Sequence, residues 1–393
     1  MNRPGDRQRL RVALIVGGLG KGGAEKQLVY MARALLRSDV DVRVFCLTKG
    51  EYYEPALEEL GIAPRWIGRF SPPPLRVLSV VAALRSFRPH IVQSTHFYAN
   101  LYAVMAGRAY RAVSIGSIRS DAVYEMRTNP VFGPLLLRGP SVLIANSIAA
   151  KLNASSRGLQ PESITVLPNV IDLPAFDAQA GAVPPRDDLQ EGATVIVVCN
   201  LRPKKRVDRF LRALALARRE VPGLTGMVVG DGPMRESLET EAGALGLLPG
   251  GISFVGHRND IPALLRKAQI YLMPSELEGF PNVILEAMAA SLPVITTPAG
   301  DAGRIVVNGI TGYVDGFDDI EDIAEHMVSL CRSGEERARF GRAGRRRVEE
   351  LYSFDVLGER LLAAYKGIAG RPGNERLRDI LSSYSISRSW DDA

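Results

Sequence analysis

Two doubly wound parallel sheets, and hence an α/β protein of two domains, are the fold that this sequence predicts. Short apolar runs rich in Val and Ile alternate with helical patterns of about 10 to 15 residues, as in β-α-β units. This alternation occurs twice along the chain. The chain has 393 residues, too many for one ordinary hydrophobic core, so the two alternations are expected to form two domains.

Five strands are expected in each half. In the first half they are RVALIVGG (11–18), DVRVFCLT (41–48), HIVQST (90–95), AVSIGSI (112–118) and SVLIANS (141–147). In the second half they are TVIVVCN (194–200), LTGMVVGDG (224–232), GISFVGH (251–257), IYLMPS (270–275) and PVITTPAG (293–300). Ligands collect at the carboxyl ends of strands in doubly wound sheets, so the residues that follow these strands are the candidates for binding and catalysis.

Changes in composition predict the domain boundaries. The predicted domains are 1–172 and 193–352, and the stretch between them, 173–192, has the prolines, glycine and small residues of a linker. A helix is expected at 353–369. The polar tail at 370–393 is expected to be flexible.

Composition restricts the function. The net charge of +6 suits a phosphate ligand or an anionic membrane surface, and no aromatic pattern favours nucleic acid. Cys46, Cys199 and Cys331 lie far apart in apolar runs, which indicates buried thiols in a reducing compartment. No apolar run reaches the roughly 18 residues that span a bilayer. A cytoplasmic protein that is free or lies on a membrane is therefore expected.

The segment SELEGFPNVILEAMAA (275–290) carries the strongest candidate site. Its carboxylates, Glu278 and Glu286, flank a helix start at which Pro281 suits the first helical position. The free N–H groups there, with Gly279 allowing close approach, suit a phosphate. Glu286 would lie about 7.5 Å along the helix from Pro281, where it can accept hydrogen bonds from both vicinal hydroxyls of a ribose. From spacing alone, a carboxylate that complements the helix dipole and a solvated surface acid explain the two residues equally well.

Three other stretches carry candidate residues. The loop after the first strand either brings backbone close to a phosphate or sugar or forms only a tight turn, and its glycines are Gly17, Gly18, Gly20, Gly22 and Gly23. A basic cluster after the first strand of the second domain either neutralises a diphosphate or is a solvated face, and it contains Arg202, Lys204, Lys205 and Arg206. His96 lies just past a first-domain strand, and it is either a catalytic residue or a packed or capping residue.

These segments resemble the family four retaining glycosyltransferases of the GT-B type. The motifs that carry the resemblance occur in the family's order within about residues 9–366, and they are GGAE (22–25), LPNVID (167–172), LRPKKRVD (201–208), VGDGP (229–233), FVGHRNDIPALLRKAQIYLMPSELEGFPNVILEAMA (254–289), PVITTPAG (293–300) and GITGYV (309–314). The two glutamates around Gly-Phe-Pro-Asn are the most specific of them. The resemblance implies two Rossmann-like domains that face a central cleft, with a first domain for the acceptor, a second for the nucleotide-sugar donor, and a last helix that returns to the first domain.

The resemblance also implies roles for single residues. Glu286 would bind the donor ribose, and Glu278 and His96 would lie near the transferred sugar. Lys205 and Arg202 would hold the phosphates. Backbone contacts to the donor are implied for Gly22, Gly23, Gly256, Gly279, Phe280, Pro281, Asn282 and Val283. In two departures from the family pattern, Cys199-Asn200-Leu201 replaces Gly-Arg-Leu, which puts the role of Arg202 in question, and Arg304 stands where many relatives have glutamate.

The implied reaction moves a sugar from a nucleotide-sugar to a glycan or lipid-linked acceptor, with retention at the anomeric carbon. The resemblance implies no metal and no further cofactor, and it favours a UDP- or GDP-linked donor over an ADP-linked one. Bacterial polysaccharide or glycolipid assembly is the expected setting. Two alternatives remain: a nucleotide-sugar 2-epimerase, and a non-catalytic nucleotide-sugar-binding protein, which Asn200 permits.

Membrane contact is a further expectation from the first domain. The stretch 69–90 is an apolar helix with basic ends, and Arg119, Arg127 and Arg138 lie near apolar residues. Such stretches could lie peripherally on an anionic inner membrane and admit a lipid-linked acceptor. Ordinary packing helices with arginine ends explain the same pattern equally well.

Overall fold

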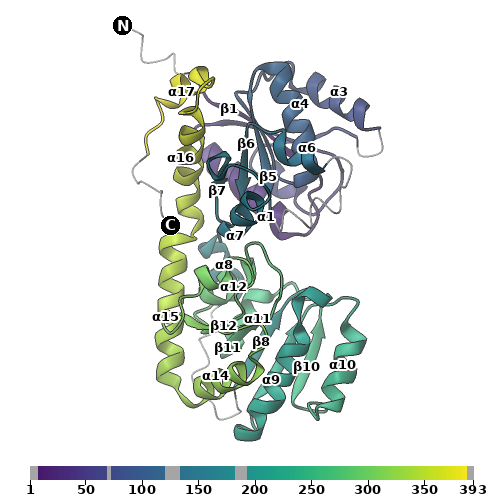
Figure 1. Ribbon diagram of the computed structural model, residues 1–393, viewed down its shortest axis with the longest axis vertical. Helices are drawn as coiled ribbons and strands as arrows, with labels where there is room; N and C mark the ends of the chain where they lie inside the picture. Colours follow the sequence, from purple (N-terminus) through teal and green to yellow (C-terminus); the bar gives the residue numbers. More distant parts are fainter. Residues whose placement is uncertain (1–7, 69–71, 120–132, 182–192, 387–393) are drawn as a thin grey trace. The chain divides into compact units, whose positions relative to one another are not determined.

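The computed structural model describes residues 8–68, 72–119, 133–181 and 193–386 of the chain (Figure 1). The chain divides into two compact units. Unit 1 consists of Met1–Val170 and Phe354–Ala393, and unit 2 consists of Ile171–Ser353. Each unit contains one sheet whose described strand pairs are all parallel, so the predicted pair of doubly wound sheets is confirmed.

The sheet of unit 1 has the strand order β3-β2-β1-β4-β5-β6-β7. Because β1 pairs in parallel with both β2 and β4, the strand order reverses beside β1, which makes the carboxyl ends of β1 and β4 a switch point where ligands collect. The strands are β1 Arg11–Val16, β2 Asp41–Cys46, β3 Arg65–Trp66, β4 Ile91–Ser94, β5 Val113–Ile118, β6 Val142–Ala145 and β7 Ile164–Val166. β3 and β7 were not predicted, because strands this short leave no apolar run in the sequence.

Helices cover both faces of this sheet. Alternate residues of β1 point to opposite faces, so Val12 and Leu14 pack with α1 and α16 while Ala13 and Ile15 pack with α3 and α4. A strand that is buried on both faces reads as a continuous apolar run. The helices of unit 1 are α1 Gly23–Arg37, α2 Glu54–Glu58, α3 Pro73–Leu84, η1 Phe97–Ala99, α4 Asn100–Tyr110, α6 Gly133–Arg138, α7 Ile148–Ser155, η2 Pro161–Ser163, η4 Phe354–Val356, α16 Leu357–Ala369 and α17 Glu375–Leu381.

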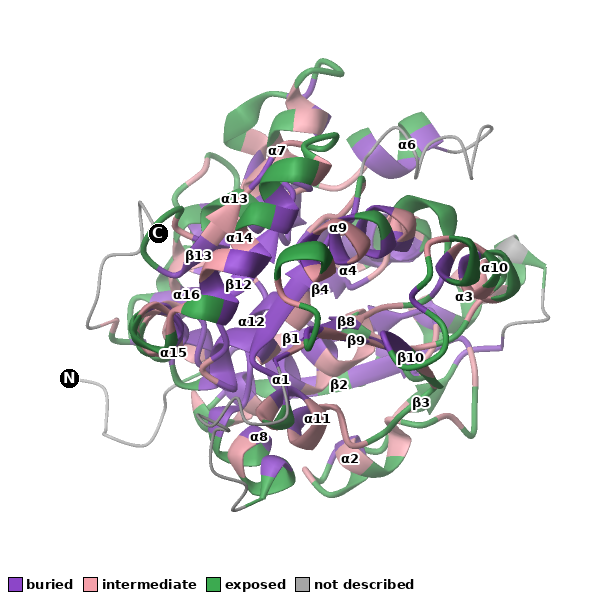
Figure 2. Cartoon of the chain, turned by 90° about the horizontal axis from the view of Figure 1, so that it is seen from below, coloured by how far each residue is buried: buried purple, intermediate pink, exposed green. Residues whose placement is uncertain are grey.

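The sheet of unit 2 has the order β10-β9-β8-β11-β12-β13, and the same alternation applies. Val195 and Val197 of β8 pack with α9 and α14, whereas Ile196 packs with α8, α11 and α12. Figure 2 shows the strands of both sheets mostly in the colour of buried residues. The strands are β8 Thr194–Val198, β9 Thr225–Val229, β10 Ile252–Gly256, β11 Ile270–Met273, β12 Val294–Thr296 and β13 Gly312–Val314. β13 was not predicted.

The helices of unit 2 follow the amphipathic patterns of the sequence. α9 and α14, for example, bury one apolar face and keep charged residues on the other. The helices are α8 Leu173–Ala180, η3 Pro203–Lys205, α9 Val207–Glu220, α10 Arg235–Ala244, α11 Ile261–Lys267, α12 Asn282–Ala289, α13 Ala302–Ile305, α14 Ile320–Arg332 and α15 Gly334–Leu351. Within the described ranges, none of the helices in the chain combines the length and apolar character that a bilayer span requires.

The prediction of a linker from residue 173 was wrong over its first eight residues. Leu173, Phe176 and Ala180 are buried on one side of α8, in the core of unit 2. Asp172 caps this helix, since its Oδ1 accepts a hydrogen bond of 3.2 Å from the backbone N–H of Ala175. The proline and small residues that suggested a linker are compatible with a helix, because proline is tolerated in the first turn.

The prediction of a flexible tail was also wrong for its described part. α17 buries Leu377, Ile380 and Leu381 against the core of unit 1. Beyond it, the hydroxyl of Tyr384 accepts a hydrogen bond of 2.9 Å from the backbone N–H of Leu10. These apolar side chains are spaced as on one face of a helix, and the polar residues between them hide the pattern in the overall composition.

Candidate functional site

A lysine and a glutamate meet at the carboxyl ends of two adjacent strands of unit 2. Lys205 ends η3, which follows β8, and Glu278 lies in the loop after β11. The Lys205 Nζ lies 2.5 Å from the Glu278 Oε1, and the two side chains are only 19% and 13% exposed. The structure therefore brings together two predicted site residues that are 73 positions apart in the sequence.

The helix with the second glutamate, α12, begins at Asn282, one residue later than predicted. Pro281 is its N-cap residue, with φ −80° and ψ 96°. Its ring therefore ends the extended loop and does not start the first helical turn. Glu286 lies in the second turn of α12 and is half-buried. Phe280, which directly precedes Pro281, is a core residue that packs edge-on against Tyr352, with ring centroids 5.8 Å apart.

A buried tyrosine lies near these carboxylates. The Tyr271 side chain, on β11, is fully buried, and its hydroxyl has no hydrogen-bond partner among the described residues. Burial, the nearby Cys199 thiol and the carboxylates of Glu278 and Glu286 raise the pKa of Tyr271 well above its usual value. The two carboxylates thus act on the same phenol, which places both of them near one strand, β11.

Cys199 occupies the position where the family pattern has glycine. Burial raises the pKa of the Cys199 thiol to about 12; the nearby Lys205 ammonium opposes this rise and Glu278 adds to it. The thiol is therefore protonated at neutral pH and is a poor nucleophile. Asn200 and Arg202, which follow it, are exposed, and the Arg202 guanidinium has no hydrogen bond or ion pair with the described part of the chain.

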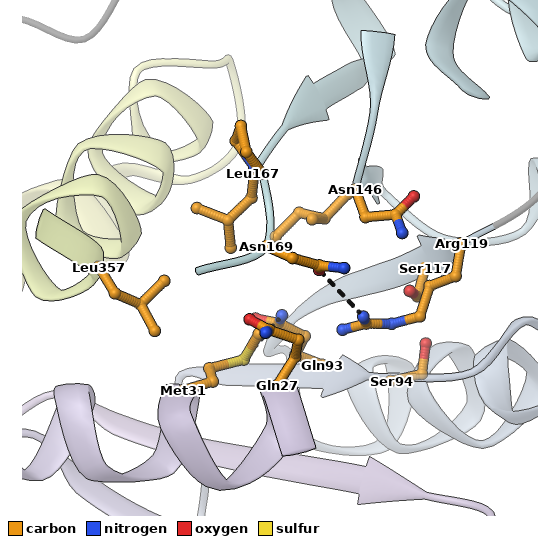
Figure 3. Close-up of a pocket in the computed structure, with 12 residues that line it drawn as sticks. Gln27, Met31, Gln93, Ser94, Ser117, Arg119, Asn146, Leu167, Asn169 and Leu357 are labelled. Carbon is orange, nitrogen blue, oxygen red and sulfur yellow. Dashed lines mark hydrogen bonds between the residues drawn. The ribbon is translucent and has the colours of Figure 1, made fainter. Parts of the chain in front are cut away.

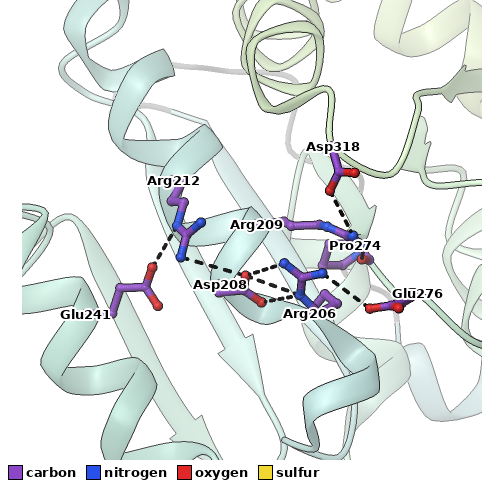
Figure 4. Close-up of polar contacts among 8 residues, drawn as sticks. All are labelled: Arg206, Asp208, Arg209, Arg212, Glu241, Pro274, Glu276 and Asp318. Atoms are coloured by element: carbon purple, nitrogen blue, oxygen red, sulfur yellow. Dashed lines mark hydrogen bonds and ion pairs between the residues drawn. The ribbon is translucent and has the colours of Figure 1, made fainter.

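Arg206 holds the two loops of this site together (Figure 4). Its backbone is left-handed, with φ 47° and ψ 45°, and its guanidinium contacts both carboxylate oxygens of Asp208 at 2.9 to 3.3 Å. It also reaches the Glu276 Oε2 at 3.3 Å, and the backbone N–H of Glu276 donates to the carbonyl of Lys204 at 2.9 Å. Within the basic cluster, Arg206 is therefore paired with the carboxylates of Asp208 and Glu276. Sequence reasoning missed Glu276.

Glycines shape the rest of this edge. Gly256, with φ 70°, ends β10, and its carbonyl accepts from the backbone N–H of Gly230 at 2.8 Å. Gly300 has φ 61°, and a Cβ there would lie 2.4 Å from the carbonyl oxygen of Gly279. The next residue, Asp301, donates its N–H to that same carbonyl at 3.1 Å. The loop after β12 thus supports the turn before α12, and only glycine fits at position 300.

In unit 1, the glycine-rich loop leads into a histidine–glutamate pair. Gly22 is the N-cap residue of α1 and Gly23 its first residue, so the loop lies between β1 and α1 as predicted. The Nδ1 of His96 accepts from the backbone N–H of Gly17 at 3.3 Å, and its Nε2 lies 3.2 Å from the Glu25 Oε1. With Nδ1 accepting, Nε2 carries the proton and donates it to the carboxylate.

Glu25 is a site residue that sequence reasoning did not single out, although it ends the quoted GGAE motif. Burial alone would raise the pKa of Glu25, but the hydrogen bond from His96, a backbone N–H and the positive charge of Arg119 lower it below its usual value. Glu25 is therefore ionised at neutral pH and holds His96 in one orientation.

A polar pocket lies at the carboxyl ends of β4, β5 and β6 in unit 1 (Figure 3). Arg119, which follows β5, donates to the carbonyl of Thr95 at 2.9 Å and to the Asn169 Oδ1 at 3.5 Å. The side-chain amide of Gln27 bonds to both backbone polar groups of Val170, at 2.7 and 3.0 Å. Asn146 also lines the pocket, and its buried Oδ1 has no partner within the described ranges.

Of the other two arginines in the membrane hypothesis, Arg138 is exposed and donates to the carbonyl of Arg157 at 3.4 Å. Arg127 lies outside the described residues. Arg119 lines the polar pocket, so of the two described arginines Arg138 is the one that is exposed.

Two family models match the chain. The model described as Glycosyltransferase Family 4 matches residues 21–174, and the model described as Glycosyl transferases group 1 matches residues 186–347. Together they match well over half of the 393 residues.

Individual proteins also resemble the chain. A GDP-mannose-dependent alpha-(1-6)-phosphatidylinositol monomannoside mannosyltransferase of Mycobacterium tuberculosis is 30% identical over 217 residues, 52% of this chain and 56% of that protein. The Vi polysaccharide biosynthesis protein VipC/TviE of Salmonella typhi is 35% identical over 120 residues, 28% of this chain and 20% of that protein. The matches thus span about half, or less, of these relatives.

A solved structure shares the fold. The crystal structure of Anabaena Alr3699/HepE in complex with UDP and glucose superposes with a TM-score of 0.77 and 20% sequence identity, covering 91% of this chain and 99% of that one. At this level of identity, the likeness concerns the fold alone.

Proposed function

Since this chain belongs to glycosyltransferase family four, we propose that it transfers a sugar from a nucleotide-sugar donor to a glycan or lipid-linked acceptor in bacterial polysaccharide or glycolipid synthesis. The family models support a glycosyltransferase. The names of the relatives, a Vi polysaccharide biosynthesis protein and a phosphatidylinositol monomannoside mannosyltransferase, support the setting.

The observation that carries the proposal is the Lys205–Glu278 pair beside the start of α12. An ammonium at the end of β8 and the first-turn N–H groups of α12 are suited to a diphosphate. Glu286, in the second turn, is suited to accept from the hydroxyls of a ribose. We assign the donor to these groups in unit 2. A UDP- or GDP-linked sugar is the preferred donor.

Glu278 competes with a diphosphate for Lys205. When the diphosphate takes the ammonium, the Glu278 carboxylate is released and can accept a hydrogen bond from a sugar hydroxyl. This exchange would link occupation of the phosphate site to orientation of the sugar.

For the chemical step we propose retention without a metal ion. The bond from the anomeric carbon to the diphosphate oxygen breaks, and the acceptor oxygen forms the new bond on the same face. The proton of the acceptor hydroxyl passes to the departing diphosphate oxygen. Lys205 and the start of α12 would stabilise the negative charge that develops on the leaving group. Arg202, which is exposed after β8, is proposed as a further phosphate ligand.

We assign the acceptor to unit 1. The ionised Glu25 holds the His96 ring, and the polar pocket with Arg119 and Asn146 lies at the carboxyl ends of the same sheet. In addition, α3 has no acidic residue in its first turn and exposes Leu75 and Leu78, at 53% and 63%. These exposed leucines support peripheral docking on an anionic membrane. Co-sedimentation with vesicles that does not depend on anionic lipid would contradict the docking.

The first test is a mass-spectrometric screen of UDP-, GDP- and ADP-linked sugars, incubated with the protein in the absence of acceptor. We expect slow release of one nucleotide. Glu286→Gln should lower kcat/KM for this hydrolysis by about 10- to 100-fold, since it weakens hydrogen bonds to a charged group. Glu321→Gln, an exposed first-turn change on α14, is the matched control and should leave it unchanged.

Other outcomes of the same screen would overturn the proposal. Conversion of a donor to its epimer would identify an epimerase. Tight binding of a nucleotide-sugar without turnover, with and without candidate acceptors, would identify a binding protein. Loss of hydrolysis in Glu321→Gln but not in Glu286→Gln would move the site away from α12.

A further inference from the structure

Four arginines surround a buried histidine at the amino-terminal edge of the unit 1 sheet. Arg11 begins β1, Arg88 and His90 precede β4, and Arg111 precedes β5. Arg376 comes from the first turn of α17. This arginine cluster lies at the opposite ends of the strands from His96 and the polar pocket, so the proposed transfer reaction does not use it.

A cavity of about 40 Å³ opens beside this cluster. Its lining includes His90, Arg111, Asn374 and Arg376, so three separate segments of the chain contribute polar side chains to it. The volume exceeds what one ordered water needs. Arg111 and Arg376 are exposed, whereas His90, which also lines the cavity, is only 5% exposed.

Positive charge in the cluster is not balanced locally. The side chains of Arg88, Arg111 and Arg376 have no ion pair with an acidic residue in the described part of the chain. Burial and the charges of Arg376 and Arg88 lower the pKa of Arg11, and the nearby carboxylate of Asp41 only partly opposes them. Burial, Arg11 and Arg376 also lower the pKa of His90 to about 4. The ring is therefore neutral at pH 7.

Hydrogen-bond donors outnumber acceptors in the cluster. The backbone N–H of Arg11 donates to the His90 Nδ1 at 3.0 Å, and the Arg11 Nη2 lies 2.9 Å from the Nε2 of the same ring. The amide nitrogen of Gln8 also faces that Nε2, at 3.4 Å. A neutral imidazole accepts at only one of its nitrogens, and here that is Nδ1, so the N–H on Nε2 faces other N–H groups. An acceptor-rich ligand would satisfy these surplus donors.

The nearest carboxylates do not serve as that acceptor. Glu375, beside Arg376 in the sequence, accepts from the backbone N–H of Gly373 at 3.1 Å. Asp39 pairs with Arg9 at 2.9 Å. Among the described residues, only Asp41 remains as a nearby counter-charge for Arg11, and no hydrogen bond or ion pair joins the two side chains.

We propose that the arginine cluster binds a phosphate group, at a site separate from the proposed donor and acceptor sites. Guanidinium groups present several N–H donors in a plane that matches two phosphate oxygens. The same chemistry occurs in a free phosphate compound and in the headgroup of an anionic phospholipid. The phosphate neutralises the cluster and accepts from its surplus donors.

The test observes the histidines by NMR while inorganic phosphate is added at pH 7 and constant ionic strength. The chain has four histidines, so the His90 ring signal can be assigned by His90→Gln. We expect a saturable shift of the His90 signal. The double variant Arg111→Gln with Arg376→Gln should lose at least about 10-fold in phosphate affinity, because it removes two charged donors. The control, Arg219→Gln with Arg342→Gln, removes two exposed arginines of unit 2 and should bind phosphate normally.

Vesicles separate the two sources of phosphate. Phosphatidylcholine vesicles with and without phosphatidylglycerol are sedimented with the protein and with both double variants. Retention on anionic vesicles that the Arg111 and Arg376 variant loses identifies a lipid headgroup; phosphate binding without such retention identifies a free phosphate compound. Failure of the His90 signal to saturate, or equal binding by both double variants, overturns the proposal. Thermal unfolding checks that each variant is folded, and no outcome depends on transferase activity.

Discussion

Lys205 and Glu278 neutralise each other at the carboxyl ends of β8 and β11, so a change at one releases the other. Lys205→Met should reduce kcat/KM for donor hydrolysis by about 100-fold, since it removes a charge that stabilises the leaving group. Glu278→Gln should instead tighten binding of the free nucleoside diphosphate by about 10-fold, because the Lys205 ammonium is no longer shared with a carboxylate. Calorimetric titration with UDP and GDP measures the second effect, and the hydrolysis assay measures the first.

The matched control for this pair is Lys267→Met, which removes an exposed ammonium at the end of α11. It should change both quantities by less than about 3-fold, as expected for a solvated charge. Weaker nucleotide binding in Glu278→Gln would contradict the exchange of partners at Lys205. It would mean that the carboxylate holds the ammonium in place for the phosphate.

His326 makes the stability of unit 2 depend on pH. Its Nδ1 lies 2.9 Å from the Asp315 Oδ1, and its ring stacks on Tyr313 at 3.7 Å between centroids. Burial acts to lower the pKa of His326, but the hydrogen bond to Asp315 and the charges of Asp315, Asp322 and Glu325 outweigh it and raise the pKa above 6.5. A histidine with a higher pKa in the folded state stabilises the fold fully below pH 6.5 and loses that contribution as pH rises through the folded value.

The corresponding prediction concerns His326→Gln. Urea unfolding should show a larger loss of unfolding free energy at pH 5.5 than at pH 8.5, relative to the unchanged chain. Ser237→Ala, at an exposed residue of the same unit that does not titrate, should show no such pH dependence. An equal loss at both pH values for His326→Gln would show that stacking on Tyr313, and not the charge, stabilises this position.

At the scale of elements, Arg206 joins the loop after β8 to the loop after β11. Arg206→Ala removes the contacts to Asp208 and Glu276 but keeps a left-handed backbone, whereas Arg206→Gly removes the contacts and relieves the strain. Both variants should lower kcat for donor hydrolysis by about 10-fold, since Lys205 is no longer fixed. The alanine variant should be less stable than the glycine variant by about 1 kcal/mol.

The control for these variants is Arg212→Ala, on α9, the helix that Arg206 caps. Arg212 pairs with Glu241 of α10 at 2.9 Å and lies 4.0 Å from the Asp208 carboxylate, but among the described residues it has no ion pair with the loop after β11 (Figure 4). It should lose little activity. Equal kcat values for all three variants would show that the backbone hydrogen bond from Glu276 to Lys204 is sufficient to hold the loops together.

At the scale of the molecule, unit 1 depends on both ends of the chain. α16 packs on α1, and the Tyr365 hydroxyl donates to the Gln93 Oε1, which lies on β4, at 2.7 Å. α17 adds three buried apolar side chains to the same core. Truncation after residue 371 should therefore destabilise unit 1 by at least about 3 kcal/mol, through loss of this burial.

Hydrogen exchange measures this prediction region by region. In the truncated chain, the amides of β1 and β4 should exchange faster, whereas those of β8 and β11 should keep their protection. Equal loss of protection in both units would contradict the division of the chain into two compact units. Unchanged protection in β1 and β4 would show that α17 adds nothing to the core of unit 1.

Local patterns were sufficient for much of this structure. Ten strands, the glycine-rich loop before α1 and the segment with Glu278 and Glu286 could be predicted because periodicity and spacing are properties of neighbouring residues. The short strands β3, β7 and β13 were missed, since two or three residues carry no period. β12 is as short as β7 and β13, but it was predicted as part of the longer stretch 293–300. Composition was misleading for α8 and α17, where a few buried side chains among polar or small ones specify a packed helix.

The order of strands and helices, the two-sheet fold and the kinds of residue at the site were encoded along the chain itself. The pairing of Lys205 with Glu278 across 73 positions, the contacts of Arg206 and the packing of α17 on the core of unit 1 were not. Parallel sheets place the ends of distant strands side by side, and a side chain's partner then depends on which strands become neighbours. No local sequence pattern specifies which strands become neighbours. That order depends on burying both faces of the sheet, which involves residues from the whole unit.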